Sequence, residues 1–172
     1  KLTGDATGNR IDGGGGDDVL NGGAGDDTLD GGAGFDVASY ENATAGVRVD
    51  LSKVGTLQNT RGDGLDKLTG FEGLKGSVFA DILRGDKADN SFEGGAGDDL
   101  IDGGAGFDTA IYAGASGAYT WTLNDNGSWT VRGAQGVDTL LNVEALRFTD
   151  RTVTLSRSAT SATIESLTQV GS

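Results

Sequence analysis

The chain is organised by a nine-residue pattern in which one large apolar residue recurs among glycines and acids. Written in nines from Gly13, it reads GGGGDDVLN, GGAGDDTLD and GGAGFDVAS, with a looser copy, GDATGNRID, from Gly4. The same frame returns from Gly76 as GSVFADILR, GDKADNSFE, GGAGDDLID and GGAGFDTAI. A fixed period of this kind is typical of stacked repeats, so it favours a regular turn-rich fold over low-complexity disorder.

Each nonapeptide predicts a turn followed by a short strand. The glycine-rich positions permit the left-handed turns that other residues resist. The next three, as in Thr28-Leu29-Asp30, suit a strand whose middle side chain points inward. We therefore predict an all-β fold, a right-handed parallel β-roll with two nonapeptides per turn and short flanking strands and hairpins. Its thin core is formed by the eighth residue of each unit: Ile11, Leu20, Leu29, Ala38, Leu83, Phe92, Ile101 and Ala110.

A longer period of 72 residues is superimposed on the short one. It takes Tyr40 onto Tyr112 and continues beyond the nonapeptides, where Asp66-x-Leu68 maps onto Asp138-x-Leu140 and Glu72 onto Glu144. Four nonapeptides and a 36-residue connecting block are thus present twice without a net gap. The alternating apolar pattern of the block predicts two strands around a turn, formed in the second copy by NDNG at 124–127. We expect these blocks to extend or cap the roll.

The two periods define the organisation of the chain. We predict one β-roll unit over residues 1–75 and a second over 76–155, the latter closed by a strand in FTDRTVTL. Residues 156–172 are rich in Ser and Thr and predict a tail or linker. The chain begins with Lys1 rather than Met, so we expect it to be part of a longer protein.

Composition narrows the chemistry. The formal net charge of −13 and the absence of clustered cations argue against nucleic acid or an anionic membrane as partner. No apolar stretch approaches the roughly 20 residues of a membrane helix, so we expect no membrane insertion. Neither Cys nor His occurs, which removes disulfides, the usual zinc ligands and most nucleophilic triads. An acidic excess is typical of a solvated surface or of a site for hard cations.

Position six of each unit supplies the candidate metal ligands. These eight residues are Asn9, Asp18, Asp27, Asp36, Asp81, Asn90, Asp99 and Asp108. Stacking of every second unit pairs Asn9 with Asp27, Asp18 with Asp36, Asp81 with Asp99, and Asn90 with Asp108. Side-chain oxygens from successive turns, together with carbonyls of the glycine-rich turns, offer an all-oxygen site that suits several Ca²⁺ ions better than the strict octahedron of Mg²⁺.

Other interpretations of these residues fit the sequence less well. In one isolated turn, Asp and Gly are better explained by the turn conformation alone. In two registered stacks, however, unneutralised carboxylates would lie close together and repel one another. An EF-hand does not fit, because the nearest match, Asp26-x-Thr28-x-Asp30-Gly31, has Val37 where the final Glu is required. No phosphate-binding G-K-[ST] follows a glycine run. The position-five acids (Asp17, Asp26, Asp98) add negative potential or are simply solvated.

Aromatic residues in the second block raise the question of a sugar ligand. Tyr119, Trp121 and Trp129 could stack on a sugar ring. Their counterparts in the first block are Val47, Val49 and Leu57, and positions that accept either aliphatic or aromatic residues indicate packing. Packing is therefore the favoured interpretation, with sugar binding as the lesser alternative.

Over roughly residues 4–155 the chain resembles the RTX, or haemolysin-type, calcium-binding family. The resemblance is carried by GGAGDDTLDGGAGFD, GGAGDDLIDGGAGFD and the connecting stretch GLDKLTGFEGLKGSVFADILRGD. It implies calcium at the eight position-six residues, bacterial type I secretion, and folding on meeting external calcium. Asn9 and Asn90 depart from the Asp consensus, and Ala38 and Ala110 depart at the apolar position, as we expect at the end of a roll.

Three classes of function follow. The first is a calcium-binding module, secreted or displayed at the cell surface, that supports the secretion and stability of a larger extracellular protein through a neighbouring domain. The second is a calcium-rigidified repeat of a surface array, filament or adhesin, with self-association; an accessory carbohydrate-binding module is less favoured. An enzyme is third: we expect no active site, because a carboxylate pair such as Asp17 and Asp18 is better used by a cation.

Overall fold

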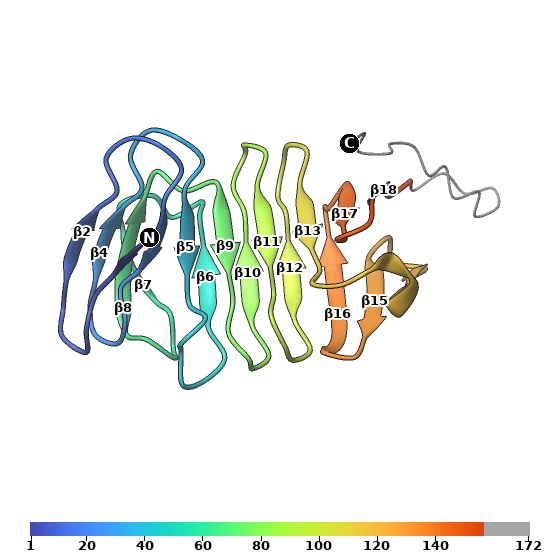
Figure 1. Cartoon of the computed structure of the whole chain (residues 1–172), viewed down its shortest axis with the longest axis horizontal. Coiled ribbons are helices and arrows are strands. Elements are labelled where there is room, and N and C mark those ends of the chain that lie inside the picture. The colour runs from blue at the N-terminus through green and yellow to red at the C-terminus, as the bar shows by residue number, and fades with distance from the viewer. Residues whose placement is uncertain (157–172) are drawn as a thin grey trace.

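Short strands stack side by side along the whole length of the molecule in the computed structural model, which describes residues 1–156 (Figure 1). The strands run across the long axis and are joined by turns at both edges of the stack. Two faces of strands enclose a thin core, and most neighbouring strands pair in parallel. This arrangement confirms the all-β parallel roll predicted from the nonapeptides.

One face of the roll is a single sheet that runs from end to end. Its strand order is β1-β3-β5-β9-β11-β13-β17-β18, and every pairing is parallel except the last. The strands are β1 (Leu2–Thr3), β3 (Val19–Asn21), β5 (Val37–Ser39), β9 (Gly73–Lys75), β11 (Ser91–Glu93), β13 (Thr109–Ile111), β17 (Ala145–Arg147) and β18 (Thr152–Thr154). The sheet passes without interruption from β9 to β11, that is, across the predicted boundary between residues 75 and 76.

The opposite face is divided into two sheets. The four-stranded sheet, in the order β2-β4-β8-β7, contains β2 (Arg10–Asp12), β4 (Thr28–Asp30), β8 (Leu65–Thr69) and β7 (Leu57–Asn59). The six-stranded sheet, in the order β14-β15-β16-β12-β10-β6, contains β14 (Thr120–Leu123), β15 (Trp129–Gly133), β16 (Gly136–Leu141), β12 (Leu100–Asp102), β10 (Ile82–Arg84) and β6 (Arg48–Asp50). One short 3₁₀ helix, η1 (Ser116–Ala118), precedes β14.

The register of the strands follows the sequence repeat. Within an array, paired residues are two nonapeptides apart, as in Leu20 with Ala38 and Leu83 with Ile101. At the connecting blocks the roll continues with a different spacing, so Ala38 pairs with Leu74 and Leu29 with Leu68. The blocks therefore extend the roll as predicted, because each continues both faces: β8 and β9 follow the first array, and β16 and β17 follow the second.

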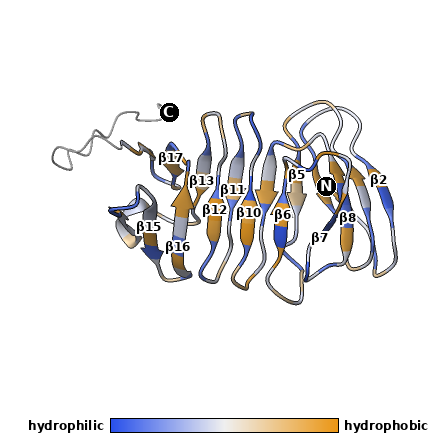
Figure 2. Ribbon diagram, turned by 180° about the vertical axis from the view of Figure 1, so that it is seen from behind, coloured by the Kyte–Doolittle hydropathy of each residue, from blue (hydrophilic) through white to orange (hydrophobic). Residues whose placement is uncertain are grey.

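The core is a stack of single apolar side chains from the two faces. The predicted core residues are buried, except that Ile11, on the edge strand β2, is only partly buried. Figure 2 shows hydrophobic residues concentrated on strands such as β10, β12 and β16, with more hydrophilic residues in the turns. A core this thin depends on stacking, because no single unit buries enough apolar surface alone.

The expectation that Ala38 and Ala110 mark the end of a roll is wrong. Both are fully buried in the middle of the long sheet, where Ala38 pairs with Leu74 and Ala110 with Leu146. Tyr40, like its counterpart Tyr112, lies two residues further on and is buried in the same core. In both units the small alanine at the eighth position is thus followed by a buried tyrosine.

Two further predictions concern the second block and the tail. The predicted hairpin is present, since β14 and β15 pair in antiparallel fashion on either side of residues 124–128. The predicted closing strand is β18, which adds to β17 at the end of the long sheet. The predicted tail lies, beyond Ser156, outside the described residues. No helix within residues 1–156 is both long and apolar enough to cross a bilayer.

Candidate metal sites in the glycine-rich turns

The structure brings together the four pairs of position-six residues predicted from the repeat. In each pair, the backbone N–H of the first residue donates to the Oδ1 atom of the second, one turn of the roll further on. The N···O distances are 2.7 Å for Asn9 to Asp27, 2.8 Å for Asp18 to Asp36, 2.9 Å for Asp81 to Asp99, and 2.7 Å for Asn90 to Asp108. One oxygen of each second carboxylate is thereby used to join consecutive turns.

The other oxygen of these same four carboxylates has no protein partner. The Oδ2 atoms of Asp27, Asp36, Asp99 and Asp108 are buried and accept no hydrogen bond. The four residues are only 1%, 0%, 2% and 0% exposed, respectively. A buried, ionised oxygen without a donor or cation is strongly unfavourable. Each predicted pair therefore contains one atom that requires a positively charged partner.

Whether an oxygen of the position-six side chain lacks a hydrogen bond correlates with the second residue of its turn. In three turns the second residue is not glycine, and its N–H closes onto the position-six side chain: Asp5 onto Asn9 at 2.8 Å, Ser77 onto Asp81 at 2.6 Å, and Asp86 onto Asn90 at 2.9 Å. In the consensus turns the second residue is glycine in a left-handed conformation, as at Gly32 with φ of 98°. No equivalent bond forms in those turns of the described chain, so the carboxylate oxygen stays available.

Backbone carbonyls converge on the same places. A Cβ added to Gly103 would lie 2.1 Å from the carbonyl oxygen of Asn142 and 2.6 Å from Oδ2 of Asp108. An unpartnered carboxylate oxygen and a carbonyl from the adjacent turn thus share one small space that only glycine leaves open. Oxygen donors of both kinds are typical of calcium sites. The residues present fit that ion.

Side-chain clusters alone do not make the site. Within residues 1–156, no three acidic side chains gather closely enough to hold a metal by themselves. Each ion would depend on one or two carboxylates and on several carbonyls of the turns. Calcium tolerates this mixed set of 6–8 oxygens, whereas Mg²⁺ demands a stricter octahedron.

Burial makes the electrostatics of the turns unfavourable without a cation. It raises the pKa of Asp99 to about 7, and the nearby charges of Asp138, Asp81 and Asp98 contribute in the same direction. Burial also raises the pKa of Asp108 to about 6, with a further contribution from Glu144. The pKa values of Asp27 and Asp81 are raised for the same primary reason. A bound cation would keep these carboxylates ionised.

The stacked position-six residues continue into acidic residues of the connecting blocks. The prediction of site residues did not include these acids. The N–H of Asp27 donates to Oδ1 of Asp66 at 3.0 Å, and that of Asp36 donates to Oε2 of Glu72 at 2.9 Å. The second unit repeats both bonds, from Asp99 to Asp138 and from Asp108 to Glu144. A signal was present in the sequence, because each acid stands two residues before a buried leucine and recurs after 72 residues.

A shortened turn explains why two of these acids are glutamates. The turn before β9 contains only Gly70, Phe71 and Glu72, whereas a nonapeptide turn has six residues. The longer side chain of Glu72 reaches the N–H that an aspartate would otherwise meet. The first residue of this short turn is left-handed in both units, with φ of 67° at Gly70 and 50° at Asn142. Glycine and asparagine are the residues that tolerate this conformation best.

The position-five acids do more than add negative potential. Oδ1 of Asp17 accepts the N–H of Phe35 at 2.9 Å, Oδ1 of Asp26 accepts that of Leu65 at 2.9 Å, and Oδ1 of Asp98 accepts that of Val137 at 2.8 Å. They are exposed, but each joins its turn to the next. The interpretation that they are simply solvated is therefore wrong.

The aromatic residues of the second block pack on the end of the core. Tyr119, Trp121 and Trp129 are partly buried against it. The ring of Phe148 lies 5.5 Å from that of Trp121 and 5.3 Å from that of Tyr119, measured between centroids. This cluster supports the packing interpretation over a sugar-stacking platform.

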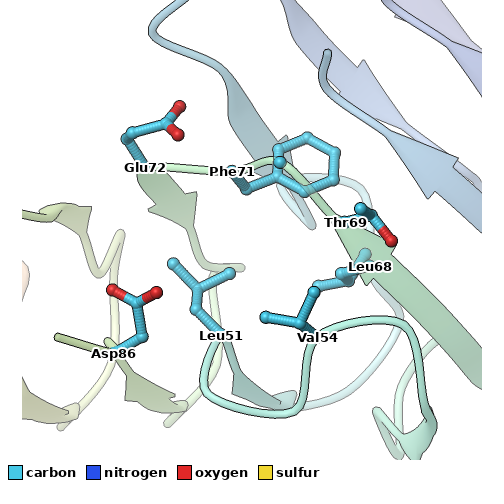
Figure 3. Close-up of a pocket in the computed structure, with 8 residues that line it drawn as sticks. Leu51, Val54, Leu68, Thr69, Phe71, Glu72 and Asp86 are labelled. Carbon is cyan, nitrogen blue, oxygen red and sulfur yellow. The ribbon is translucent and has the colours of Figure 1, made fainter. Parts of the chain in front are cut away.

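A cavity of about 110 Å³ lies between the loop that follows β6, the end of β8 and the short turn before β9 (Figure 3). Leu51, Val54 and Phe71 give it apolar walls, and the carboxylates of Glu72 and Asp86 stand on one side. Both carboxylates already accept backbone N–H groups, Glu72 from Asp36 and Asp86 from Ala88. The acids at this cavity therefore serve the adjoining turns.

Comparison with known proteins agrees with the geometry of the turns. The model of the RTX calcium-binding nonapeptide repeat matches residues 3–38 and 76–110, in four copies. The matched segments contain all eight position-six residues, and they exclude the block acids Asp66, Glu72, Asp138 and Glu144. Comparison of the chain with curated proteins gives no match.

Proposed function

We propose that this chain, a calcium-binding structural module built from RTX nonapeptide repeats, folds when it meets calcium outside the cell. The observation that carries the proposal is the set of buried, unpartnered Oδ2 atoms at Asp27, Asp36, Asp99 and Asp108. Without a cation, these charges oppose the closure of the turns. With calcium, each ion ties a carboxylate to carbonyls of the adjacent turn, so binding energy becomes folding energy.

The thin core makes this dependence strong. Hydrophobic residues make up 35% of the chain, and the net charge is −13. Ordering the backbone costs about 1–2 kcal/mol per residue, which a single row of apolar side chains offsets poorly. Extracellular calcium modules typically have dissociation constants of about 10⁻⁴–10⁻³ M. A module of this affinity would remain open in a low-calcium cytosol and close after export, which supports type I secretion of a larger protein.

Circular dichroism with and without a calcium chelator tests the proposal. We expect a β spectrum in millimolar calcium and a largely disordered spectrum in chelator, with recovery when calcium is restored. The double variant Asp27→Asn/Asp99→Asn should need more calcium to fold. The matched variant Asp12→Asn/Asp125→Asn removes the same charge from exposed positions and should fold like the parent chain. An unchanged β spectrum in chelator would contradict the proposal.

A structural role in a surface assembly is the second candidate. It is favoured by the uninterrupted sheet that joins the two 72-residue units, since units of this kind can be added without a break. Light scattering in calcium separates the two roles. An accessory module should remain monomeric, whereas a module of an array or filament should associate.

We further propose that the module has no catalytic role. The chain lacks His and Cys, and the acids of its turns accept backbone hydrogen bonds that hold the roll together. Incubation of the folded module with model ester, peptide and glycoside substrates should give no turnover. Hydrolysis that persists after repurification, and is lost in an acid-to-amide variant, would contradict this.

A further inference from the structure

The divided face of the roll contains a seam between β6 and β7, which are the end strands of its two sheets. Among the described strands, β6 pairs only with β10 and β7 only with β8. The two are joined instead by the amide of Gln58, which bridges the backbone of Asp50, and by the N–H of Arg48, which donates to the carbonyl of Thr60 at 3.2 Å. In the second block the corresponding strands, β14 and β15, pair directly. The seam is therefore a feature of the first block.

A cavity of about 160 Å³ opens at this seam. Its lining is polar throughout and comes from both strands and the loop between them: Arg48, Asp50, Lys53, Gln58 and Asn59. Arg48 and Asp50 flank a fully buried residue of β6, so their side chains lie on the outer face of the strand. The cavity is thus open to a ligand from solvent, away from the core.

The two cations of the cavity have no acidic partner. The ion pairs within residues 1–156 include neither Arg48 nor Lys53, and both side chains are exposed. The carboxylate of Asp50 is engaged by the loop, because its Oδ1 atom accepts the N–H of Ser52 at 3.1 Å and the hydroxyl of Ser52 at 2.5 Å. A guanidinium and an ammonium group are therefore left to interact with something outside the chain.

Further cations lie in the same stretch of the first block. Residues 48–67 contain four of the 13 basic side chains, and two of the three acids in this stretch, Asp63 and Asp66, are only 7% and 1% exposed. The second block adds β16 and β17 to the roll without these cations, so the fold does not require them. After the 72-residue offset, Arg48, Lys53, Arg61 and Lys67 correspond to Thr120, Asp125, Gly133 and Thr139.

The net charge of the chain does not prevent anion binding at this place. The value is −13, and many of the acids lie in the glycine-rich turns at the edges of the roll. At physiological ionic strength, exposed charges more than about 8 Å apart are largely screened from one another. The cations that line the cavity therefore dominate its local electrostatics.

We propose that the cavity between β6 and β7 binds an oxyanion, the carboxylate or phosphate group of a small acidic ligand. The guanidinium of Arg48 offers paired N–H donors, and Lys53 adds a point charge. The Oδ1 atom of Asn59 accepts the N–H of Arg61 at 2.9 Å, so its Nδ2 group is left to donate to the ligand. This proposal goes beyond the calcium-binding function, because it assigns a second kind of ligand to a different surface.

Amide-resolved NMR of the full chain in saturating calcium, at constant ionic strength, tests the proposal. The probes are glucuronate, glucose phosphate and glucose, which share a sugar ring and differ in the anionic group. We expect saturable shifts of the Lys53 and Asn59 signals with the two acidic sugars and none with glucose. The acidic sugar of higher affinity shows whether the site favours a carboxylate or a phosphate.

A matched pair of variants locates the site. Arg48→Thr should weaken binding about tenfold or more, because a charged donor is lost. Arg132→Thr makes the same substitution at an exposed position of the second block and should bind like the parent chain. Both variants should give the circular dichroism spectrum of the parent in calcium, since both side chains are exposed.

Three results would overturn the oxyanion site: no saturable shift in the parent chain, an equal response to glucose, or equal affinity in Arg48→Thr. None of them would affect the proposed function, because calcium-dependent folding is measured without these ligands.

Discussion

The two connecting blocks, residues 40–75 and 112–147, have related sequences and opposite consequences for the roll. In the first, β6 pairs in parallel with β10 of the next array, with Val49 opposite Leu83. In the second, the corresponding strand β14 pairs in antiparallel fashion with β15, with Trp121 opposite Val131. The first block passes the roll on and the second closes it. One sequence pattern thus supports two strand pairings. In the first block the next array supplies a parallel partner, β10, and in the second block the partner is β15 of the same block.

A single side chain marks the difference between the blocks. Gln58 is 5% exposed, and its amide bridges the backbone of Asp50: Oε1 accepts the Asp50 N–H at 2.8 Å and Nε2 donates to the Asp50 carbonyl at 3.3 Å. At the corresponding position of the second block, Thr130 pairs directly with Thr122 through the backbone. The amide of Gln58 therefore takes the place of a strand ladder and leaves the other edge of β6 to β10.

Aromatic residues mark the closed end. Phe148 packs between Tyr112, at 5.7 Å between ring centroids, and Trp121, at 5.5 Å. The corresponding residue of the first unit is Gly76, which lies under the next turn of the roll. In the first unit the next array covers the end of the core. In the second unit aromatic side chains cover it.

The largest effect is expected at this aromatic end. Phe148 is 6% exposed, so Phe148→Ala should destabilise the second unit by about 3–5 kcal/mol, through lost burial and the cavity left behind. Urea unfolding in saturating calcium, followed by tryptophan fluorescence, measures it, because Trp121 and Trp129 both lie in that unit. Phe107→Ala, at a phenylalanine that is 50% exposed, is the control. Equal losses in the two variants would show that the cluster does not close the roll.

Acidification should release calcium from the second unit. The raised pKa values of Asp99, about 7, and Asp108, about 6, mean that protons bind the calcium-free folded state better than the unfolded chain. Without calcium, stability should rise as the pH falls through 7 and be lost as the pH rises again. With calcium, protons compete for the carboxylates, so affinity should fall by roughly tenfold to a hundredfold from pH 7 to pH 5.

Calcium titrations at several pH values, read by tryptophan fluorescence, follow this second unit selectively. Asp99→Asn should flatten most of the dependence on pH, because it removes the group with the highest of these values. An affinity at pH 5 equal to that at pH 7 would contradict the assignment of calcium to these carboxylates.

Exchange of the bridging residue tests why the blocks pair differently. Gln58→Thr, which installs the residue of the second block, should cost about 1–3 kcal/mol, because the N–H and carbonyl of the half-buried Asp50 lose the buried side chain that bonds them. Thr130→Gln, at a half-buried position, should cost less. Chemical unfolding in calcium provides both values. A smaller loss for Gln58→Thr than for Thr130→Gln would rule out the bridging role.

The smallest effect is expected at the position-five acids. Asp26→Ala removes the acceptor of the Leu65 N–H, and Asp98→Ala removes that of the Val137 N–H. These are exposed hydrogen bonds, so each variant should lose about 0.5–1.5 kcal/mol, and the two should lose similar amounts. Thermal unfolding in calcium measures the pair. A loss confined to one of them would mean that the two arrays are joined to their blocks differently.

Much of this structure follows from local sequence. The nonapeptide specifies its own turn and strand, so the parallel roll, the eighth-position core and the four stacked pairs are predictable from residues such as Asp27 and Leu29. The continuation of the rows through Asp66 and Glu72 was not predicted, because the turns that carry them depart from the nonapeptide frame. The bridge from Gln58 to Asp50 spans only eight residues, but neither residue belongs to a nonapeptide, so the repeat does not predict it. The burial of Asp63 depends on stacking against the turn at Gly25, which is distant in sequence.

A crystal structure of the chain grown in saturating calcium tests the central claim most directly. We predict a calcium ion about 2.3–2.6 Å from Oδ2 of each of Asp27, Asp36, Asp99 and Asp108, with carbonyls of the adjacent turn completing each site. If these oxygens contact only water or protein donors while the roll is fully formed, calcium is not what closes the turns.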